Sequence, residues 1–186
     1  MKAVLSKVTG GPDALVVEDI PAPTAGPGQA LISVKAVGVN FPDVLMIEDK
    51  YQSRPPRPFS PGGELSGVIK AVGEGVTNVK VGDRVLANTG WGGMAEEVAL
   101  PANRLWHIPD SMPHDEAAAF ILTYGTSFHA LKHRGRVKAG ESLLVLGAAG
   151  GVGLAAVELG KAMGMRVVAA CSSQEKVDLA KKHGAD

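Results

Sequence analysis

Short runs of β-branched and other apolar residues alternate with polar positions through the first 112 residues of the chain. Glycine and proline separate these runs, a pattern typical of β-strands joined by turns. The prolines between Pro55 and Pro61 exclude helix and favour exposed loops. The sequence therefore predicts an all-β domain, with one short helix that starts at Phe41. The predicted strands are Lys2–Val8, Leu15–Ile20, Ala30–Val37, Leu65–Val72, Arg84–Ala87, Met94–Leu100 and Arg104–Ile108.

A helical pattern begins after Pro113. Asp115 and Glu116 occupy a first turn, where acidic side chains are favourable, and apolar or small residues continue as far as Leu131. This pattern predicts one helix, and we place the domain junction within it. The predicted domains are residues 1–118 and 119–186.

The second domain has the pattern of a strand, a helix and another strand. The apolar run Leu143–Leu146 predicts a parallel strand buried on both faces. A helix is predicted over Val152–Met163, followed by a strand over Arg166–Ala170 and the start of a second helix. This order predicts an α/β domain of the doubly wound type, with a parallel sheet.

The glycine-rich turn between the first of these strands and its helix is a candidate phosphate site. Amide groups that open a helix lack intrahelical acceptors and lie at its positive end. Gly150 and Gly151 allow a phosphate to approach the backbone, and Gly153 allows the helix to pack closely on the strand. When the chain is aligned with the pattern G-x-G-x-x-G, Ala148 takes the place of the first glycine. The candidate cofactor-binding residues here are Ala149, Gly150, Gly151, Val152 and Gly153; alternatively, the glycines only make a tight turn.

Residues after the second strand bear on the choice of dinucleotide. NAD-preferring sites place a carboxylate at that strand end, whereas this chain has Ser172 and Ser173, with Lys176 in the next helix. Hydroxyls and an ammonium group suit the 2′-phosphate of NADP, so we predict NADPH. In an alternative interpretation, Ser172 forms a capping box with Glu175 and Lys176 is a solvated surface lysine; this is compatible with NADPH binding, because the cap leaves Ser173 and Lys176 free. In another, Glu175 binds the ribose hydroxyl and favours NADH.

The composition of the chain argues against nucleic-acid-binding and membrane-spanning proteins. The 186 residues carry 19 basic and 19 acidic side chains and few aromatics, which argues against a nucleic-acid partner. The N-terminus has no apolar signal core and no stretch reaches membrane-spanning length, so a cytoplasmic protein without a membrane partner is expected. The single cysteine, Cys171, excludes an internal disulfide. His129 and His133 have i,i+4 spacing but no third ligand nearby, which favours surface residues over a metal site.

Five motifs occur in family order: Gly38–Asp43, Pro61–Gly67, Gly82–Val85, Gly92–Glu96 and Ala148–Gly153. With them the whole chain resembles the medium-chain dehydrogenase/reductase superfamily, specifically its zinc-free quinone oxidoreductase branch. The resemblance implies a GroES-like β-barrel catalytic domain followed by a Rossmann cofactor domain, with the active site in the cleft between them. For the full-length family form it also implies a homodimer, since family members are commonly dimers.

The zinc alcohol dehydrogenases of the same superfamily differ from this chain at their metal ligands. Where they carry a ligand cysteine, this chain has Asn40; Gly63 and Glu64 replace their His-Glu pair, and Leu122 and Thr123 stand near the remaining cysteine position. Catalytic zinc needs three protein ligands. The resemblance thus implies metal-free hydride transfer to an electron-poor conjugated acceptor, such as a quinone or an enone.

The resemblance also suggests site residues. It places Asn40 beside the nicotinamide and the acceptor, Tyr51 at the rim of the substrate pocket, and Thr126 near the nicotinamide carboxamide. Asn40 is equally suited to cap the helix that follows it, and Tyr51 to be an ordinary half-buried aromatic. Asp43 and Glu64 are expected to have structural roles, with Glu64 in an internal salt bridge or hydrogen bond.

The sequence contains only two of the strands that a doubly wound domain needs. We expect a truncated Rossmann sheet with exposed apolar surface, and hypothesise a fragment or a chain completed by another polypeptide. The leading function is an NADPH-dependent quinone or enone reductase. The alternatives are a 2-enoyl thioester reductase, a non-catalytic NADPH-binding or structural protein, and an inactive fragment.

Overall fold

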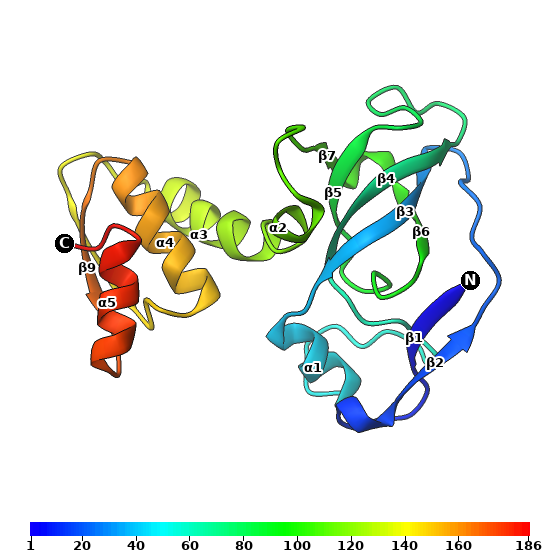
Figure 1. Cartoon of the computed structure of the whole chain (residues 1–186), viewed down its shortest axis with the longest axis horizontal. Coiled ribbons are helices and arrows are strands. Elements are labelled where there is room, and N and C mark those ends of the chain that lie inside the picture. The colour runs from blue at the N-terminus through cyan, green and yellow to red at the C-terminus, as the bar shows by residue number, and fades with distance from the viewer. The chain divides into compact units, whose positions relative to one another are not determined.

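Antiparallel strands dominate the first of two units, Met1–Ala119, in the computed structural model, which describes residues 1–186. Strands β1 (Lys2–Ser6) and β2 (Leu15–Asp19) form a two-stranded sheet in which Lys2 pairs with Asp19. A second sheet has five strands in the order β6-β3-β4-β5-β7, all antiparallel (Figure 1). Its strands are β3 (Gln29–Gly38), β4 (Glu64–Val72), β5 (Arg84–Asn88), β6 (Glu97–Pro101) and β7 (Leu105–His107).

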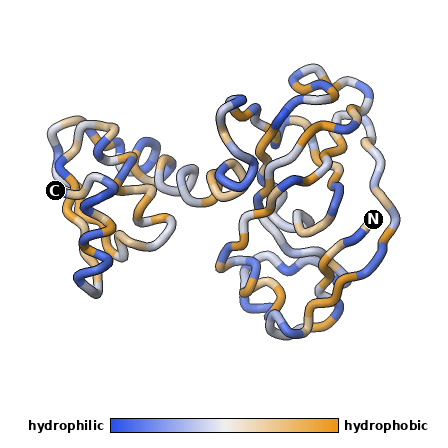
Figure 2. The backbone as a smooth tube through the Cα atoms, in the orientation of Figure 1, coloured by the Kyte–Doolittle hydropathy of each residue, from blue (hydrophilic) through white to orange (hydrophobic).

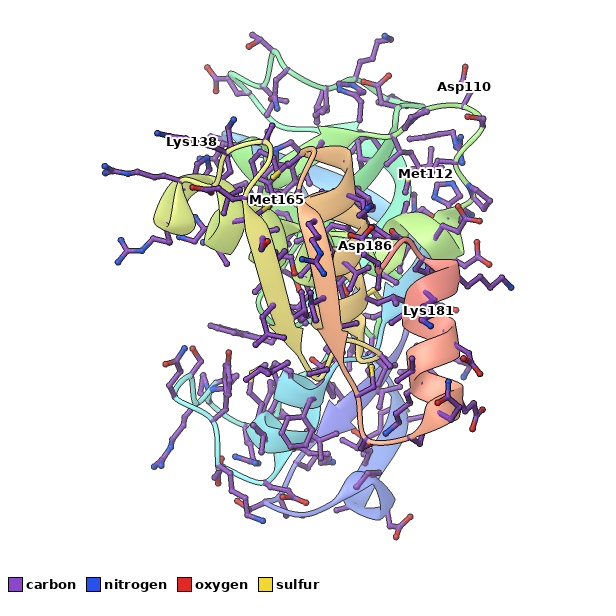
Figure 3. The ribbon with its side chains drawn as sticks, turned by 90° about the vertical axis from the view of Figure 1, so that its left-hand side faces the viewer. Asp110, Met112, Lys138, Met165, Lys181 and Asp186 are labelled. Carbon is purple, nitrogen blue, oxygen red and sulfur yellow. The ribbon has the colours of Figure 1, made fainter.

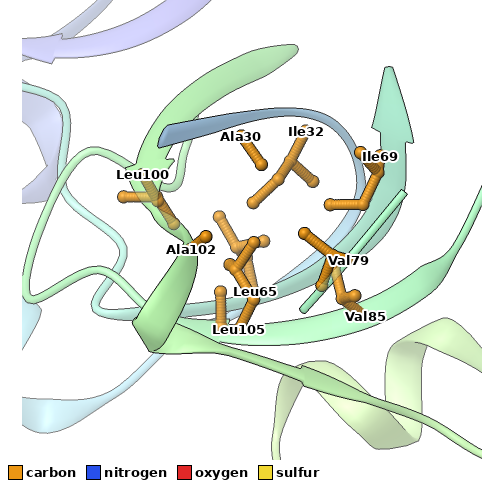
Figure 4. Close-up of a cluster of buried hydrophobic side chains, with 10 residues drawn as sticks. Ala30, Ile32, Leu65, Ile69, Val79, Val85, Leu100, Ala102 and Leu105 are labelled. Atoms are coloured by element: carbon orange, nitrogen blue, oxygen red, sulfur yellow. The ribbon is translucent and has the colours of Figure 1, made fainter. Parts of the chain in front are cut away.

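The five-stranded sheet curves around the main hydrophobic core of this unit. Register shifts in β3, at Leu31/Ile32 and Val34/Ala36, bend the strand against β4. Figure 4 shows the enclosed side chains pointing toward one another from several strands. Ile32, Leu65 and Val85 are completely or almost completely buried there. The curved sheet with its inward-pointing apolar residues agrees with the all-β domain that the sequence predicts.

Two short helices complete the first unit. Helix α1 (Phe41–Ile47) begins where predicted, and helix α2 (His114–Ala118) carries acidic residues in its first turn. The predicted continuous helix to Leu131 is wrong, because α2 stops at Ala119, whose φ and ψ of −104° and 9° lie outside the α-helical region.

The second unit, Phe120–Asp186, opens with a helical segment of mixed hydrogen bonding. The π-helical turns η3 (Ile121–Gly125) and η4 (His129–Gly135) flank the single turn α3 (Thr126–Phe128). Arg136 ends the segment in the left-handed conformation, at a φ of 52°. The sequence lacks a proline that would have marked these breaks, so the tertiary environment sets them.

Strands β8 (Ser142–Leu146) and β9 (Arg166–Ala170) then pair in parallel, joined by helix α4 (Gly151–Ala162). Helix α5 (Gln174–Lys182) follows β9, and Figure 2 shows its largely hydrophilic sequence. The predicted strand–helix–strand order is confirmed. All predicted strands of both units are present, with ends shifted by a few residues.

The β8–β9 sheet is covered on one face only. On that face Val145 and Val167 are buried with Val157 of α4 and Ala180 of α5. The opposite face, toward the viewer in Figure 3, carries no helix. Leu144 and Leu146 are 61% and 75% exposed there, so the prediction of a strand buried on both faces is wrong for these residues. The reason is that α4 and α5 both pack against the same side of the sheet.

Candidate active site

The glycine-rich turn connects the end of β8 to the start of α4. Gly147 adopts a φ of +64°, and the amides of Gly147 and Ala148 both donate to the carbonyl oxygen of Ala170 at the end of β9. Gly150 is the N-cap residue of α4, and no side chain caps the helix. The amides of the first turn therefore have neither an intrahelical acceptor nor a capping side chain, which is the geometry that suits an anion.

Gly153 is essential to this turn for a steric reason. A Cβ atom at this position would overlap the carbonyl oxygen of Gly147 and lie 2.9 Å from Cα of Ala148. Helix α4 thus approaches the strand end more closely than any side chain would permit, as the fingerprint predicts. Gly147, which the fingerprint does not include, supplies the left-handed residue of the turn. Its position directly after the apolar strand is the signal that could have identified it.

Two pockets adjoin the turn, both within the second unit. One has a volume of about 500 Å³ and contains Thr126 together with the predicted residues Gly150, Gly151, Val152 and Gly153. The structure therefore brings Thr126, more than 20 residues earlier in the chain, to the mouth of α4.

The other pocket, of about 530 Å³, lies between the turn and α5. It is lined by Ala149, Glu175, Lys176, Asp178, Leu179 and Lys182. Two lysines and two acidic residues give this pocket both positive and negative charges. Ala149 is the residue of the glycine-rich turn that lines it. Residues of the turn thus line both pockets, and ligand sites are concave surfaces of this kind.

The structure decides which of the two serines after β9 caps the following helix. Ser173, not Ser172, is the N-cap residue of α5, since its Oγ accepts a hydrogen bond from the amide of Lys176 at 3.4 Å. The predicted capping box of Ser172 and Glu175 is therefore wrong. Ser172 instead accepts a hydrogen bond from Nζ of Lys176 at 3.1 Å. The helix begins one residue later than the capping-box pattern suggests, which leaves Ser172 and Lys176 as an exposed polar pair.

In the first unit, Asn40 and Glu64 form a hydrogen-bonded pair. Asn40 precedes α1, and its Nδ2 donates to Oε1 of Glu64 at 2.9 Å. Asp43 holds the surrounding backbone, because its two carboxylate oxygens accept from the amides of Asn40 and Gly62 at 2.8 and 3.0 Å. The expected structural roles of Asp43 and Glu64 agree with these contacts. Asn40 occupies the capping position of α1 and forms a capping box with Asp43, as the alternative considered above expects, while its Nδ2 group points at Glu64.

Tyr51 lies in the turn region after α1. It is partly buried and packs against a small apolar cluster that contains Met46, Ile47 and Phe59. Its ring is thus held by apolar neighbours. The predicted role of its hydroxyl at the substrate pocket remains a prediction.

A polar network that the sequence does not reveal links three helical segments of the second unit. The hydroxyl of Tyr124 donates to Oε2 of Glu158, and Nδ1 of His183 lies 2.5 Å from Oε1 of the same carboxylate. The hydrogen bond to Glu158, together with burial, raises the pKa of Tyr124 to about 12. Burial alone would raise the pKa of Glu158, but hydrogen bonds from Tyr124 and His183 lower it overall. These residues are far apart in the sequence, so no local motif identifies them.

Metal-ligating side chains do not gather anywhere in the structure in groups of three or more. His129 and His133 approach each other, with their Nδ1 atoms 3.2 Å apart, on an exposed helical surface. None of the helices has both the length and the apolar character needed to cross a bilayer.

Comparison with known families gives two matches along the chain. Residues 26–110 match the alcohol dehydrogenase GroES-like domain, and residues 151–186 match the family described as zinc-binding dehydrogenase. The first match covers the five-stranded sheet, and the second begins at the first residue of α4.

Individual relatives are similar over almost the whole chain. The quinone oxidoreductase-like protein 2 homolog of Nematostella vectensis is 42% identical over 99% of this chain and 50% of its own length. The human synaptic vesicle membrane protein VAT-1 homolog is 40% identical over 94% of this chain and 45% of its own length. The chain spans about half the length of these curated relatives.

Among solved structures, the quinone oxidoreductase of Thermus thermophilus, studied also as its complex with NADPH, is 41% identical. It superimposes with a TM-score of 0.89 over 100% of this chain and 58% of its own. The motifs, the two matched families and these relatives agree, and the chain belongs to the quinone oxidoreductase branch of the medium-chain dehydrogenase/reductase superfamily.

Proposed function

We propose that this protein is an NADPH-dependent oxidoreductase that reduces a quinone or another electron-poor conjugated carbonyl compound. The observation that carries the proposal is the uncapped first turn of α4, where Gly153 packs against the backbone of Gly147. Similarity to quinone oxidoreductases, one of them studied in complex with NADPH, supports this assignment.

The second unit would hold the cofactor by its phosphates. The amides of Gly151, Val152 and Gly153 are suited to bind the pyrophosphate oxygens at the positive end of α4. Thr126 shares a pocket with these residues and would contact the nicotinamide half. When bound, NADPH supplies the hydride, and the protein contributes binding and orientation.

The exposed pair of Ser172 and Lys176 supports NADPH over NADH. An ammonium group beside a hydroxyl offers charge and hydrogen bonds to a 2′-phosphate. Ser173 caps α5 with its hydroxyl oxygen as the acceptor, and its O–H remains available as a donor. Glu175 lines the neighbouring pocket and is the residue that would favour NADH.

We assign Asn40 and Tyr51 to the reacting end of the site. Both carry neutral hydrogen-bonding groups, which can orient a carbonyl acceptor without a metal. Since Asn40 stands at a zinc-ligand position of the related alcohol dehydrogenases, we propose that the reaction proceeds without zinc. An acceptor that is already electron-poor needs no Lewis acid to accept a hydride.

Steady-state assays of the intact protein test this function. We expect oxidation of NADPH, followed by its absorbance, with a para-quinone acceptor, and slower oxidation of NADH. The activity should survive dialysis against a chelator. Faster turnover of a 2-enoyl thioester than of any quinone would instead favour the thioester reductase. Tight NADPH binding without turnover of either class would favour a non-catalytic role.

A further inference from the structure

Glu64 is a carboxylic acid placed in the interior of the first unit. Its side chain is 2% exposed, and its backbone lies at the first residue of β4, paired with Gly38 and Asn88 of the neighbouring strands. Burial of a polar group is costly unless hydrogen bonds compensate for the lost water. A buried carboxylic acid in a strand therefore indicates a role other than packing.

Space for the Glu64 side chain exists only because residue 38 is glycine. A Cβ atom on Gly38 would lie 2.7 Å from Oε1 and 2.9 Å from Cγ of Glu64, and it would overlap the carbonyl oxygen of Ala118. The carboxylate is thus confined to a narrow position beside β3. From this position Oε1 reaches Nδ2 of Asn40 at 2.9 Å.

This contact determines which way the Asn40 amide faces. Carboxylate oxygens only accept hydrogen bonds, whereas the two ends of an asparagine side chain are a donor and an acceptor. The NH₂ group must therefore face Glu64, and the carbonyl Oδ1 must face away from it. The backbone on the same residue is fixed as well, because Asp43 accepts from the amide of Asn40.

The surface around Asn40 is apolar and accessible. The side chains on either side of it, Val39 and Phe41, are 74% and 72% exposed, while Asn40 itself is half-buried. A polar amide of fixed orientation between two exposed apolar side chains is the arrangement expected where a flat, largely apolar ligand is received.

We infer that Glu64 is a positioning residue that orients the Asn40 amide for the reacting ligands. This inference rests on the proposed function, in which Asn40 contacts them. One Nδ2 proton is held by Glu64 and Oδ1 belongs to the capping box with Asp43, so Asn40 presents its second Nδ2 proton to an acceptor group. The carbonyl oxygen of the quinone is such an acceptor.

The test compares Glu64→Leu, which removes the acceptor but keeps the volume, with Glu64→Gln, which retains a carbonyl oxygen. We expect Glu64→Leu to lower kcat/KM for the quinone by about 10–100-fold, and Glu64→Gln to restore most of the loss. NADPH affinity should remain unchanged in both. Ser66→Ala is the matched control, since Ser66 is buried in the same strand and bonds to Val85 instead.

A double-mutant cycle separates positioning from general structural damage. In an Asn40→Ala background, Glu64→Leu should cause no further loss of kcat/KM, because the residue it orients is absent. An equal loss in both backgrounds, or full activity of Glu64→Leu, would overturn the inference.

The side-chain amide of Asn40 provides a readout that does not depend on turnover. In ¹H–¹⁵N spectra, we expect one Nδ2 proton to exchange slowly in the wild type and in Glu64→Gln, but rapidly in Glu64→Leu. If the wild type fails to reduce quinones, the proposed function is wrong, while this measurement still decides whether Glu64 holds Asn40. Rapid exchange in the wild type would refute the orientation itself.

Discussion

The ammonium group of Lys176 donates a hydrogen bond to the hydroxyl of Ser172 across a distance of 3.1 Å, although both side chains are exposed. The contact joins the end of β9 to the first turn of α5. An exposed lysine loses conformational freedom when it is held in this way, so the bond alone stabilises the fold little. The hydrogen bond instead places a positive charge beside a hydroxyl group at the edge of the candidate cofactor site.

Lys176→Ala should weaken NADPH binding selectively. A charged hydrogen bond contributes about 1.5–3 kcal/mol, so the Kd for NADPH should rise by about 10–100-fold, while that for NADH stays the same. Titration calorimetry or cofactor fluorescence measures both constants. Lys181→Ala is the control, because this lysine of α5 does not line the pocket. Equal weakening of both dinucleotides would contradict the assignment of Lys176 to the 2′-phosphate.

Gly153→Ala should damage both the stability and the cofactor site of the second unit. The added Cβ overlaps the backbone at Gly147, and overpacking of this kind costs about 1–3 kcal/mol. We expect lower thermal stability together with weaker NADPH binding. In contrast, Gly125→Ala introduces a Cβ with no atom within 4 Å and should leave the melting temperature unchanged or raise it. A Gly153→Ala protein that melts and binds like the wild type would show that the close approach is unnecessary.

Asp43→Ala should destabilise the first unit, because the amides of Asn40 and Gly62 lose their shared acceptor. Asp43 is 4% exposed, so water cannot easily replace it, and the loss should reach about 2 kcal/mol or more. Urea unfolding gives the free energy. Asp13→Ala, in the exposed turn before β2, serves as the comparison and should change little. Equal stabilities of the two variants would argue against a bridging role for Asp43.

The stability of the first unit should fall as the pH drops below 6.5, and His114 should contribute to this fall. Burial, followed by the positive charges of Arg84 and Lys35, lowers the pKa of His114 from 6.5, although Asp115 acts in the opposite direction. The unfolded chain therefore takes up this proton at a higher pH than the folded chain does. Stability is fully present above 6.5 and decreases as the pH falls toward the folded-state pKa.

His114→Gln tests this contribution through urea midpoints measured across the acidic range. The variant should lose part of the dependence on pH between 6.5 and the folded-state pKa. It should also be less stable at neutral pH, since the contact of Nδ1 with Ser66 at 2.7 Å is changed. Parallel pH profiles for the variant and the wild type would contradict the prediction.

The local elements of this protein could be predicted because they depend on neighbouring residues. Short apolar and alternating runs located every strand, and the glycine spacing located the turn before α4. The break after α2 could not be predicted, since no proline marks it and Ala119 is a good helix former. The N-cap of α5 was displaced by one residue, because Ser172 and Ser173 are both suitable caps and only the helix geometry distinguishes them.

The sequence by itself determined the two kinds of architecture, the glycine-rich turn before α4 and the family, because each depends on periodicity or on residues close together in the chain. Only the tertiary structure decided that Asn40 pairs with Glu64, that Tyr124 and His183 share the carboxylate of Glu158, and that Leu144 and Leu146 are exposed. Such contacts join residues that are tens of positions apart. Their partners depend on how strands and helices pack in space, which no local pattern encodes.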